Sequence, residues 1–503
     1  MQTAEKQVIV IGAGMGGLGA AIRLAALGWR VTVLEAADTP GGKARAMPSA
    51  AGPVDAGPTV LTLRATFDAL FALAGERLDD HIKLVRQPIL ARHFWPDGSQ
   101  LDLFPDTDAT IAAITTFAGA REAAAFARFD RLATDLYQAF EAPVMLSPRP
   151  DLPAILRATL RQPRLWPALL PGMTLMRLLT LQFRDPRLIQ LFARYATYVG
   201  GRPGHSPGVL ALIWRAEAAG VWAVQGGMHH LAAQLACLAE RLGVTFRYAT
   251  PAQRIVTQGG RVTGVQIAAG ATLPCAGVVF NGDPGALTAG LLGDAPRTAC
   301  PKPGPHSLSA YVWAFASTPS GPRAADLIYH NVFFSANPQA EFGPIGRGQM
   351  PEDPSLYICA QDRATGRAPP LERFEIIVNA PANRPPPPQE ADTCRNRTIP
   401  TLARMGLTFT PTPQGLTTPS LLAQRFPGSM GAIYGRSPEG ALAAFQRPQA
   451  RTALPGLYLA GGAAHPGAGV PMAALSGQHA AEAMIRDLTS RFPSPPMATP
   501  GGT

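Results

Sequence analysis

Residues 8–43 read VIVIGAGMGGLGAAIRLAALGWRVTVLEAADTPGGK, and this stretch decides the fold. Its first four residues are apolar β-formers, which predict a buried parallel strand. The glycine turn GAGMGG follows at 12–17 and leads into an apolar helical pattern that stops at Gly28, a residue suited to end a helix. A second strand is predicted over residues 30–34 and ends at Glu35. The order of strand, glycine turn, helix and strand predicts the βαβ unit of an α/β fold.

The G-x-G-x-x-G pattern of this turn predicts a dinucleotide-binding site. Gly12 permits the tight turn, Gly14 lets the backbone approach a pyrophosphate, and Gly17 lets the helix pack closely on the strand. The helix N-terminus offers unpaired N–H groups and the positive end of the helix dipole to the phosphates. Glu35 stands 23 residues after Gly12, where a carboxylate accepts hydrogen bonds from a ribose. The alternative is a glycine turn with a purely structural role, which the flanking strand, helix and acid disfavour.

Three further motifs carry a family resemblance. PGGK lies at 40–43, VDAGPTV at 54–60 and LPGLYLAGGAAHPGAGVPM at 454–472. On these motifs the chain resembles the FAD-dependent amine-oxidase-like superfamily, and within it the phytoene desaturase family of carotenoid oxidoreductases. The resemblance covers most of the chain. It implies an α/β fold with a Rossmann-like FAD-binding domain of the glutathione-reductase and amine-oxidase type, a mixed β/α substrate domain and a helical membrane-facing insertion.

The resemblance also implies FAD as the cofactor and a set of residues that bind it. These are Gly12, Ala13, Gly14, Gly17, Glu35, Gly42, Lys43, Gly57, Pro58, Thr59, Val256, Asn281, Gly461, Gly462, Gly469, Val470 and Met472. Gly462 stands where many superfamily members have an acid, which argues against an amine oxidase. His465 is the weak candidate for a catalytic residue, with a structural turn residue as an equal alternative. No metal site is predicted.

The motifs divide the chain into four regions. Residues 1–64, 225–299 and 445–490 are expected to form a discontinuous FAD-binding domain. Residues 65–144 and 300–444 are expected to form the substrate domain, whose second part reads as mostly β. Residues 145–224 form the helical insertion, and the proline- and glycine-rich tail at 491–503 is expected to be disordered.

Composition excludes several classes of protein. Apolar residues make up 47% of the chain and charged residues 16%, which is typical of a folded and rather apolar protein. The net charge of +10 is compatible with an anionic partner, but 40 of the 44 basic residues are arginine, so coding bias explains part of it. No module for nucleic acid occurs. The five scattered cysteines without C-x-x-C, and an N-terminus that enters the first strand at once, predict a reduced, cytoplasmic protein without a signal peptide.

Residues 152–184 predict contact with a membrane surface. They carry five arginines and no acid around the apolar run LWPALLPGMTLMRLLTL at 165–181. Pro167, Pro171 and Arg177 argue against a transmembrane span. An apolar segment that bears a tryptophan and is flanked by cations is suited to anionic lipid, and a buried helical hairpin with solvated arginines is the alternative. We therefore expect peripheral, monotopic association with the inner membrane; the sequence leaves the oligomeric state open.

Further motifs refine the resemblance within the family. HNVFFS at 330–335, YICAQDR at 357–363, NAPAN at 379–383 and HPGAGVPM at 465–472 resemble the 1-hydroxycarotenoid 3,4-desaturase (methoxyneurosporene dehydrogenase) branch of purple photosynthetic bacteria. That branch implies a long apolar carotenoid substrate of the hydroxyneurosporene or methoxyneurosporene type. Gln361, Asp362 and Arg363 are candidates to recognise its polar end group, with a solvated loop as the favoured alternative.

Three other functions stay open at this stage. A phytoene-type desaturase or a carotenoid isomerase belongs to the same class of enzyme. A prenyl-binding escort protein shares the fold without using flavin, and the intact glycine turn with Glu35 argues against it.

Overall fold

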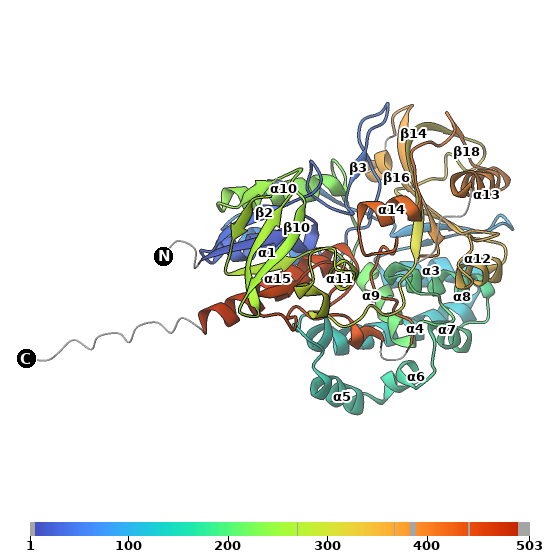
Figure 1. Ribbon diagram of the computed structural model, residues 1–503. Coiled ribbons are helices and arrows are strands. Elements are labelled where there is room, and N and C mark those ends of the chain that lie inside the picture. Colours follow the sequence, from blue (N-terminus) through green and yellow to red (C-terminus); the bar gives the residue numbers. More distant parts are fainter. Residues whose placement is uncertain (1–5, 269, 367, 383–388, 441–442, 491–503) are drawn as a thin grey trace, which may run out of the picture.

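The computed structural model describes residues 6–268, 270–366, 368–382, 389–440 and 443–490 (Figure 1). The tail expected to be disordered, 491–503, lies outside these residues. Figure 1 shows the first and last parts of the chain together on one side, an antiparallel sheet at the upper right and a layer of helices below it.

A five-stranded parallel sheet is built from three separated stretches of the chain. Its order is β20-β13-β1-β2-β9. The strands are β1 (Gln7–Ile11), β2 (Arg30–Leu34), β9 (Thr245–Arg247), β13 (Gly277–Phe280) and β20 (Leu457–Leu459). The βαβ unit expected at the N-terminus is present, because β1 pairs in parallel with β2 and helix α1 (Met15–Ala26) joins them.

The two faces of this sheet are covered differently. Val8 and Val10 of β1 pack among helices α1, α10 (Met228–Arg241) and α15 (Val470–Thr489). Ile9 and Ile11, on the opposite face, pack against a three-stranded antiparallel sheet. That sheet consists of β10 (Ala252–Gln258), β11 (Arg261–Ile267) and β12 (Thr272–Pro274). The period of two in β1 therefore places alternate side chains in two separate cores.

Helices α1 and α15 pack with their backbones almost in contact. A Cβ atom on Gly477 would lie 2.0 Å from the carbonyl oxygen of Gly16, and one on Gly19 would lie 2.8 Å from that of Ala474. Only residues without a side chain allow this approach. The close packing fixes the last helix against the first glycine turn.

A second sheet forms the antiparallel part of the molecule. Its order is β18-β14-β17-β16-β15-β6-β7, with β19 paired to β14. The strands are β6 (Ala91–Phe94), β7 (Gln100–Leu103), β14 (Ser309–Ser320), β15 (His330–Phe333), β16 (Leu356–Ala360), β17 (Glu372–Ala380), β18 (Thr408–Thr410) and β19 (Leu416–Thr417). β6 joins β15 in parallel, so the early hairpin at 91–103 completes a sheet whose other strands come 200 residues later.

The helical layer carries an aromatic core. Its helices are α3 (Thr107–Ala118), α4 (Ala120–Phe140), α5 (Leu152–Arg161), α6 (Trp166–Leu169), α7 (Leu175–Gln182), α8 (Pro186–Ala193) and α9 (Leu212–Ala218). Phe126, Phe192 and Trp214 pack ring against ring, and the indole N–H of Trp214 donates to Asp130 at 2.7 Å. Helices α5 and α6 lie at the outer edge of this layer (Figure 1). Among the described residues, no helix is both long and apolar enough to cross a bilayer.

The shorter elements connect these layers. They are β3 (Ala46–Met47), β4 (Val54–Asp55), α2 (Ala65–Ala72), β5 (Leu84–Arg86), β8 (Trp222–Val224), α11 (Pro284–Thr288), α12 (Pro338–Gly346), α13 (Glu390–Arg404) and α14 (Pro419–Arg425). Asp55 of β4 caps α10, because its carboxylate accepts from the amides of Met228 at 2.6 Å and His229 at 3.2 Å. This cap ties the first stretch of the chain to the second.

Candidate active site

A cavity of about 1240 Å³ lies where the layers meet. Its walls come from the glycine turn, from residues 41–45, 56–60, 280–283, 461–463 and 466–473, and from the antiparallel sheet. Helical-layer residues complete the wall, among them Ile155, Thr159, Leu169 and Met176. The cavity therefore extends from the edge of the parallel sheet to helices α5, α6 and α7.

The glycine turn at 12–17 and a second glycine turn, which begins at Gly461, meet at Asn281. The side-chain amide of Asn281 donates to the carbonyl of Gly12 at 3.1 Å. A Cβ atom on Gly16 would lie 2.5 Å from the amide nitrogen of Gly461 and 2.6 Å from Oδ1 of Asn281. The amide of Gly461 in turn donates to Oγ of Ser476 at 2.7 Å, which holds this turn on α15. The first and last motifs of the chain thus form one side of the cavity.

Each glycine of the first turn is required by a different contact. Gly12 has φ +97°, a conformation that strains other residues. A Cβ atom on Gly17 would lie 2.0 Å from the carbonyl oxygen of Gly12, and one on Gly14 would lie 2.8 Å from the Asn281 amide. Gly12 and Gly14 line the cavity, whereas Ala13 and Gly17 lie behind the lining.

Glu35 closes the β2 end of the turn. Its Oε2 accepts from the amide of Ala13 at 2.6 Å, and its Oε1 accepts from that of Ala37 at 2.8 Å. The carboxylate lines the cavity beside Gly12 and Gly14. It lies where the sequence predicts the contact to a ribose.

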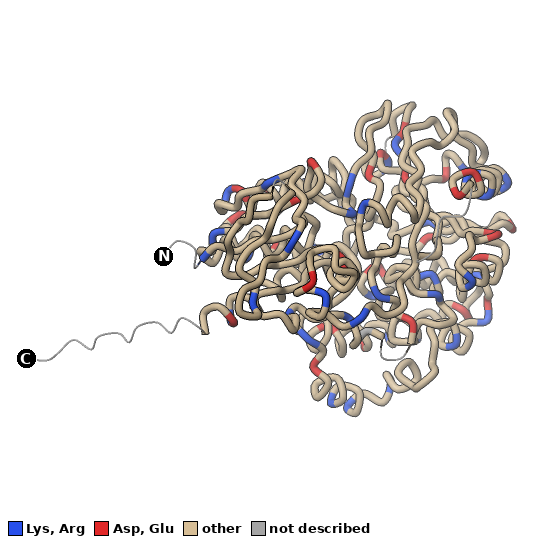
Figure 2. Tube along the Cα trace, viewed as in Figure 1, with Lys and Arg blue, Asp and Glu red and all other residues tan. Residues whose placement is uncertain are grey.

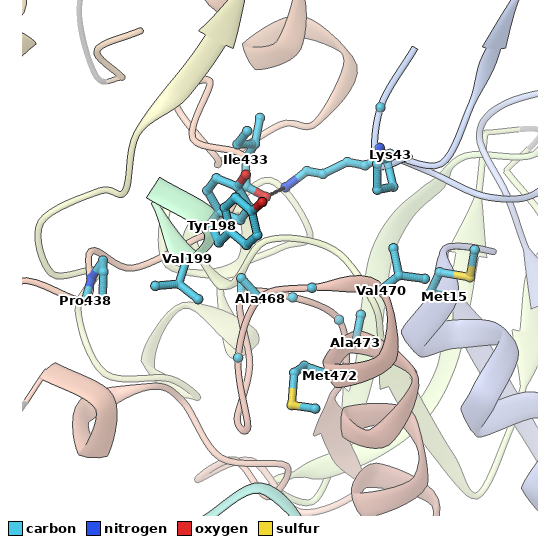
Figure 3. A pocket seen from close by; sticks show the side chains of 18 of the residues that line it. Met15, Lys43, Tyr198, Val199, Ile433, Pro438, Ala468, Val470, Met472 and Ala473 are labelled. Carbon is cyan, nitrogen blue, oxygen red and sulfur yellow. Dashed lines mark hydrogen bonds between the residues drawn. The ribbon is translucent and has the colours of Figure 1, made fainter. Parts of the chain in front are cut away.

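Lys43 reaches across the cavity to the last third of the chain. Its ammonium donates to the carbonyl oxygen of Ile433 at 2.8 Å and lies 3.4 Å from that of Ala432 (Figure 3). Burial lowers the pKa of Lys43 to about 8, although the negative charge of Asp283 opposes the shift. A buried ammonium whose partners are neutral carbonyls is suited to receive an anion such as a diphosphate.

The segment 57–59 packs directly against Lys43. A Cβ atom on Gly57 would lie 2.0 Å from the carbonyl oxygen of Lys43. Thr59 bonds the hydroxyl of Tyr357 at 2.7 Å, and Gly57, Pro58 and Thr59 all line the cavity. Gly42, whose φ is +60°, lines it as well.

Arg447 supports the second turn from behind. Its Nη1 donates to the carbonyl oxygens of Gly462 at 2.9 Å and Tyr434 at 3.0 Å. Burial, together with the positive charge of the neighbouring Arg436, lowers the pKa of Arg447 to about 10. The sequence does not mark Arg447 as a residue of the site, because nothing in its local pattern separates it from the other arginines.

Helix α15 directs its N-terminus at the cavity. Gly469 is its N-cap at φ +107°, and Pro471 lies in the first turn. Gly469, Val470 and Met472 line the cavity. Its first amides have no partners within the helix, so they present partial positive charge to the cavity.

The residues fit the expected FAD. Glycines 14 and 16 leave a cradle that side chains would fill, two helix N-termini face it, and a buried lysine adjoins it. Val256 does not line the cavity; from its strand, Ala252 does, together with the preceding Pro251.

His465 lies outside the cavity lining. Its Nε2 is 2.9 Å from the carbonyl oxygen of Ser147, and its ring stacks on His479, whose Nε2 is 3.4 Å from the carbonyl oxygen of Met145. Both imidazoles are buried. His465 thus attaches the chain between α4 and α5 to the second glycine turn, which favours the structural alternative over a catalytic role.

The candidates for the polar end group also lie elsewhere. Gln361 bonds the backbone of Asp55, Asp362 pairs with Arg373, and Arg363 pairs with Glu372. None of the three lines the cavity. Asp362 and Arg363 use their charges in ion pairs and Gln361 uses its amide on the backbone, which favours the structural alternative over recognition of the end group. Sequence reasoning also missed a charged cluster that does line the cavity, formed by Arg194, Tyr198 and Glu217.

Comparisons with known proteins agree with this geometry. The family described as flavin containing amine oxidoreductase matches residues 15–485. The chain belongs to this family. It is 61% identical over 492 residues to a hydroxyneurosporene desaturase of Rhodobacter capsulatus, covering 97% of this chain and 99% of that protein. A hydroxyneurosporene desaturase of Cereibacter sphaeroides is 60% identical, with 98% and 100% covered.

A solved structure is similar as well. An oxidoreductase from Methanosarcina mazei matches with a TM-score of 0.62 at 15% identity, covering 95% of this chain and 100% of that one. At this identity the likeness concerns the fold alone, and it confirms the α/β fold class. The family and these relatives confirm the expected carotenoid oxidoreductase resemblance. The protein is an FAD-dependent oxidoreductase, so the escort-protein alternative is not retained.

Proposed function

We propose that this protein is a carotenoid desaturase that introduces a C-3,4 double bond into 1-hydroxy or 1-methoxy acyclic carotenoids. The observation that carries the proposal is the 61% identity, over nearly the whole chain, to a protein named hydroxyneurosporene desaturase. The cavity supports it, because apolar side chains such as Val332, Phe334 and Ile433 line much of its wall. A long polyene requires such a wall.

FAD held at the glycine turns would supply the two-electron acceptor: it would take a hydride from one of two adjacent carbons, and the proton lost from the other would balance its reduction to FADH2. The residues proposed to hold it are those of the two turns, with Glu35 at the ribose, Lys43 at the diphosphate and the N-terminus of α15 at the flavin. The apolar wall excludes water from the reacting carbons. The polyene spreads the positive charge that develops next to it, so the wall need not supply a strong base.

The substrate path is proposed to open toward a membrane. Leu152, Leu156 and Leu160 of α5 are 59%, 59% and 62% exposed, and Ile155 and Thr159 on the neighbouring stripe of the same helix line the cavity. Trp166, Leu170 and Leu181 are exposed nearby. The apolar face of α5 thus runs from solvent to the cavity wall, as a docking surface for a bilayer-dissolved substrate would.

The charge around this face favours an anionic bilayer. Arg157, Arg161, Arg164 and Arg177 accompany the exposed apolar residues, and no acid lies between Leu152 and Arg184. Figure 2 shows the basic positions along the α5 segment at the lower edge of the molecule. When an apolar stripe is inserted into a bilayer, the arginines beside it are attracted to anionic headgroups.

Expression in cells that accumulate a 1-hydroxylated acyclic carotenoid tests the function. We expect a product with one more conjugated double bond, seen as a red-shifted spectrum and a mass lower by two hydrogens. Cells that accumulate phytoene serve as the comparison, and conversion there instead would favour a phytoene-type desaturase. A pigment profile identical to that of cells with empty vector would contradict the proposal.

A further inference from the structure

We propose that a buried cluster of Arg194, Tyr198 and Glu217 binds the oxygen at the end of the carotenoid and so selects hydroxylated substrates. The inference rests on the proposed function and names the polar subsite within the same cavity. It replaces the candidates at 361–363, whose side chains are used elsewhere.

The charged and phenolic groups of the cluster bond to one another and to Tyr195. Oε1 of Glu217 accepts from the hydroxyl of Tyr198 at 3.0 Å, and Oε2 accepts from Arg194 at 3.5 Å and from the hydroxyl of Tyr195. Arg194 also bonds the Tyr198 hydroxyl. Arg194 is 9% exposed and Glu217 3%. Charges buried this deeply are costly unless they are paired, so the set calls for a reason beyond stability.

Three of these four residues line the cavity. They are Arg194, Tyr198 and Glu217, whereas Tyr195 lies behind them. Their neighbours in the wall are Val199, Leu212, Ile213 and Val332, all apolar. The cluster is therefore a polar spot on a wall that otherwise suits a hydrocarbon chain.

The cluster adjoins the second glycine turn. Two residues after Tyr198, a Cβ atom on Gly200 would lie 2.6 Å from the ring of Tyr434. The carbonyl oxygens of Tyr434 and Gly462 share one nitrogen of Arg447, at 3.0 and 2.9 Å. Tyr198 and Val199 line the same cavity as Ala468 and Val470 of that turn, and Figure 3 labels all four.

The cluster also faces the segment at 57–59. The hydroxyl of Tyr357, which bonds Thr59 at 2.7 Å, lies 2.5 Å from Nδ1 of His330. Burial, together with the positive charge of Arg194, lowers the pKa of His330 to about 3, so Arg194 lies within electrostatic range of this group. Contacts through Tyr434 and Tyr357 thus connect the surroundings of the polar spot to two of the segments expected to hold the flavin.

This position is the one that the reaction requires. An oxygen on C1 is four bonds from C4, so with bonds near 1.5 Å it lies within about 5 Å of the carbons that lose hydrogen. The group that binds the oxygen must therefore stand next to the flavin site, while the rest of the polyene extends along the apolar wall.

A second polar group in the wall does not meet this requirement. Glu341 accepts from Ser355 at 2.6 Å and from Asn379 at 2.9 Å, and Gln190 of α8 donates to the carbonyl of Ser335 at 3.0 Å. These contacts tie the group to α8, α12 and the ends of β15 and β16 rather than to either glycine turn.

The hydrogen-bond capacity of the cluster defines its ligand. A carboxylate has about four acceptor sites, and Glu217 uses three, for Arg194, Tyr195 and Tyr198. The remaining site can accept the proton of a hydroxyl. Nε of Arg194 is buried without a partner among the described residues, which marks the cluster as incomplete. A hydroxyl donates to Glu217, an ether cannot, and a hydrocarbon end leaves the carboxylate unmatched.

The test measures substrate preference in the holoenzyme on vesicles. kcat/KM is determined for a 1-hydroxy acyclic carotenoid, its 1-methoxy ether and the hydrocarbon without the oxygen. We expect wild type to prefer them in that order, and Glu217→Gln to lower the ratio of hydroxylated to hydrocarbon substrate roughly tenfold or more, because a bond to a charged acceptor is lost. Tyr198→Phe keeps the ion pair and should lower the ratio less, and it decides the question should Glu217→Gln not fold.

Tyr137→Phe is the matched control. Its hydroxyl also lines the cavity and bonds a carboxylate, Glu141, at 2.9 Å, but it lies outside the cluster. Its substrate ratio should equal that of wild type, and FAD content should be the same in all variants. Equal losses on hydroxylated and hydrocarbon substrates in Glu217→Gln and Tyr198→Phe would overturn the inference.

Failure of the proposed function gives a different result. Wild type would then convert none of the three carotenoids, and their binding, followed by quenching of tryptophan fluorescence, would replace turnover. A preference for the hydroxylated carotenoid that the two variants lose still supports the cluster. Equal binding of all three by wild type rejects it.

Discussion

Close contacts of the Asn281 side chain determine the shape of the cofactor end of the cavity. Asn281 bonds Gly12 and stands within 3 Å of where side chains on Gly14 and Gly16 would begin. The sequence assigns Asn281 to the cofactor site by resemblance alone. Its role in joining two glycine turns follows from the arrangement of β1, β13 and β20, which no local pattern contains.

Lys43 gives a residue-scale prediction about pH. Its pKa of about 8 in the protein lies below the ordinary value of 10.5, so between these values the unfolded chain binds more protons and stability of the protein without FAD rises with pH. A diphosphate reverses the preference, because it favours the charged ammonium. FAD affinity should therefore fall as the pH passes 8, and Lys43→Met should lower affinity roughly tenfold below that pH.

Titration of the FAD-free protein by fluorescence, between about pH 7 and about pH 9, measures this effect. Lys43→Arg is the control, since a guanidinium stays charged throughout the range and should remove the fall in affinity. An FAD affinity in Lys43→Met that equals wild type at every pH would contradict a diphosphate contact.

Helix α5 is the element whose exposure has no explanation within the chain. Its leucines at 152, 156 and 160 recur every fourth residue and form a stripe on one face. In most soluble helices such a stripe is buried in the core, but here no residue of α5 is fully buried. The spacing of these leucines in the sequence is typical of a helix. That the stripe is exposed depends on how the other helices pack.

We predict that changing the three leucines of this stripe to serine abolishes flotation of the protein with vesicles of anionic phospholipid. The three side chains lose roughly 1.5–3 kcal/mol each of burial in the bilayer. The protein should retain its FAD and its thermal unfolding temperature, because the side chains are exposed. Serine at Leu27 and Leu421, which are exposed on other helices, is the control and should leave flotation unchanged. Undiminished flotation of the α5 variant would exclude this helix as the membrane contact.

At the scale of the whole molecule, the cavity joins stretches that are far apart in the chain. Lys43 and Ile433 are 390 residues apart, and the parallel sheet needs strands from the start, middle and end of the sequence. A ligand that contacts all three stretches stabilises the entire fold rather than one segment.

Removal of FAD should therefore lower the Tm of the protein in a single cooperative transition. Free FAD at 100 times its Kd contributes about 2.7 kcal/mol, which corresponds to a few degrees in a chain of this size. Scanning calorimetry of the protein with and without FAD measures the difference. FMN lacks the adenosine half that is proposed to contact Glu35, so it should restore less. An equal Tm with and without FAD would contradict the shared site.

The chain of 503 residues determines by itself its local elements and their chemistry. The strand, glycine turn and helix at 8–28 and the strand at 30–34 before Glu35 all follow from periodicity and turn residues. These signals are readable because each element depends on neighbours a few residues away.

Only the tertiary structure decided which side chains face the cavity. It brings Tyr198 and Glu217 together, turns His465 toward the backbone of Ser147, and uses Asp362 and Arg363 in ion pairs. The physical reason is that burial and pairing of a charge depend on which elements pack against it. In this fold those elements come from opposite ends of the chain, so the sequence supplies the groups and their packing selects the site.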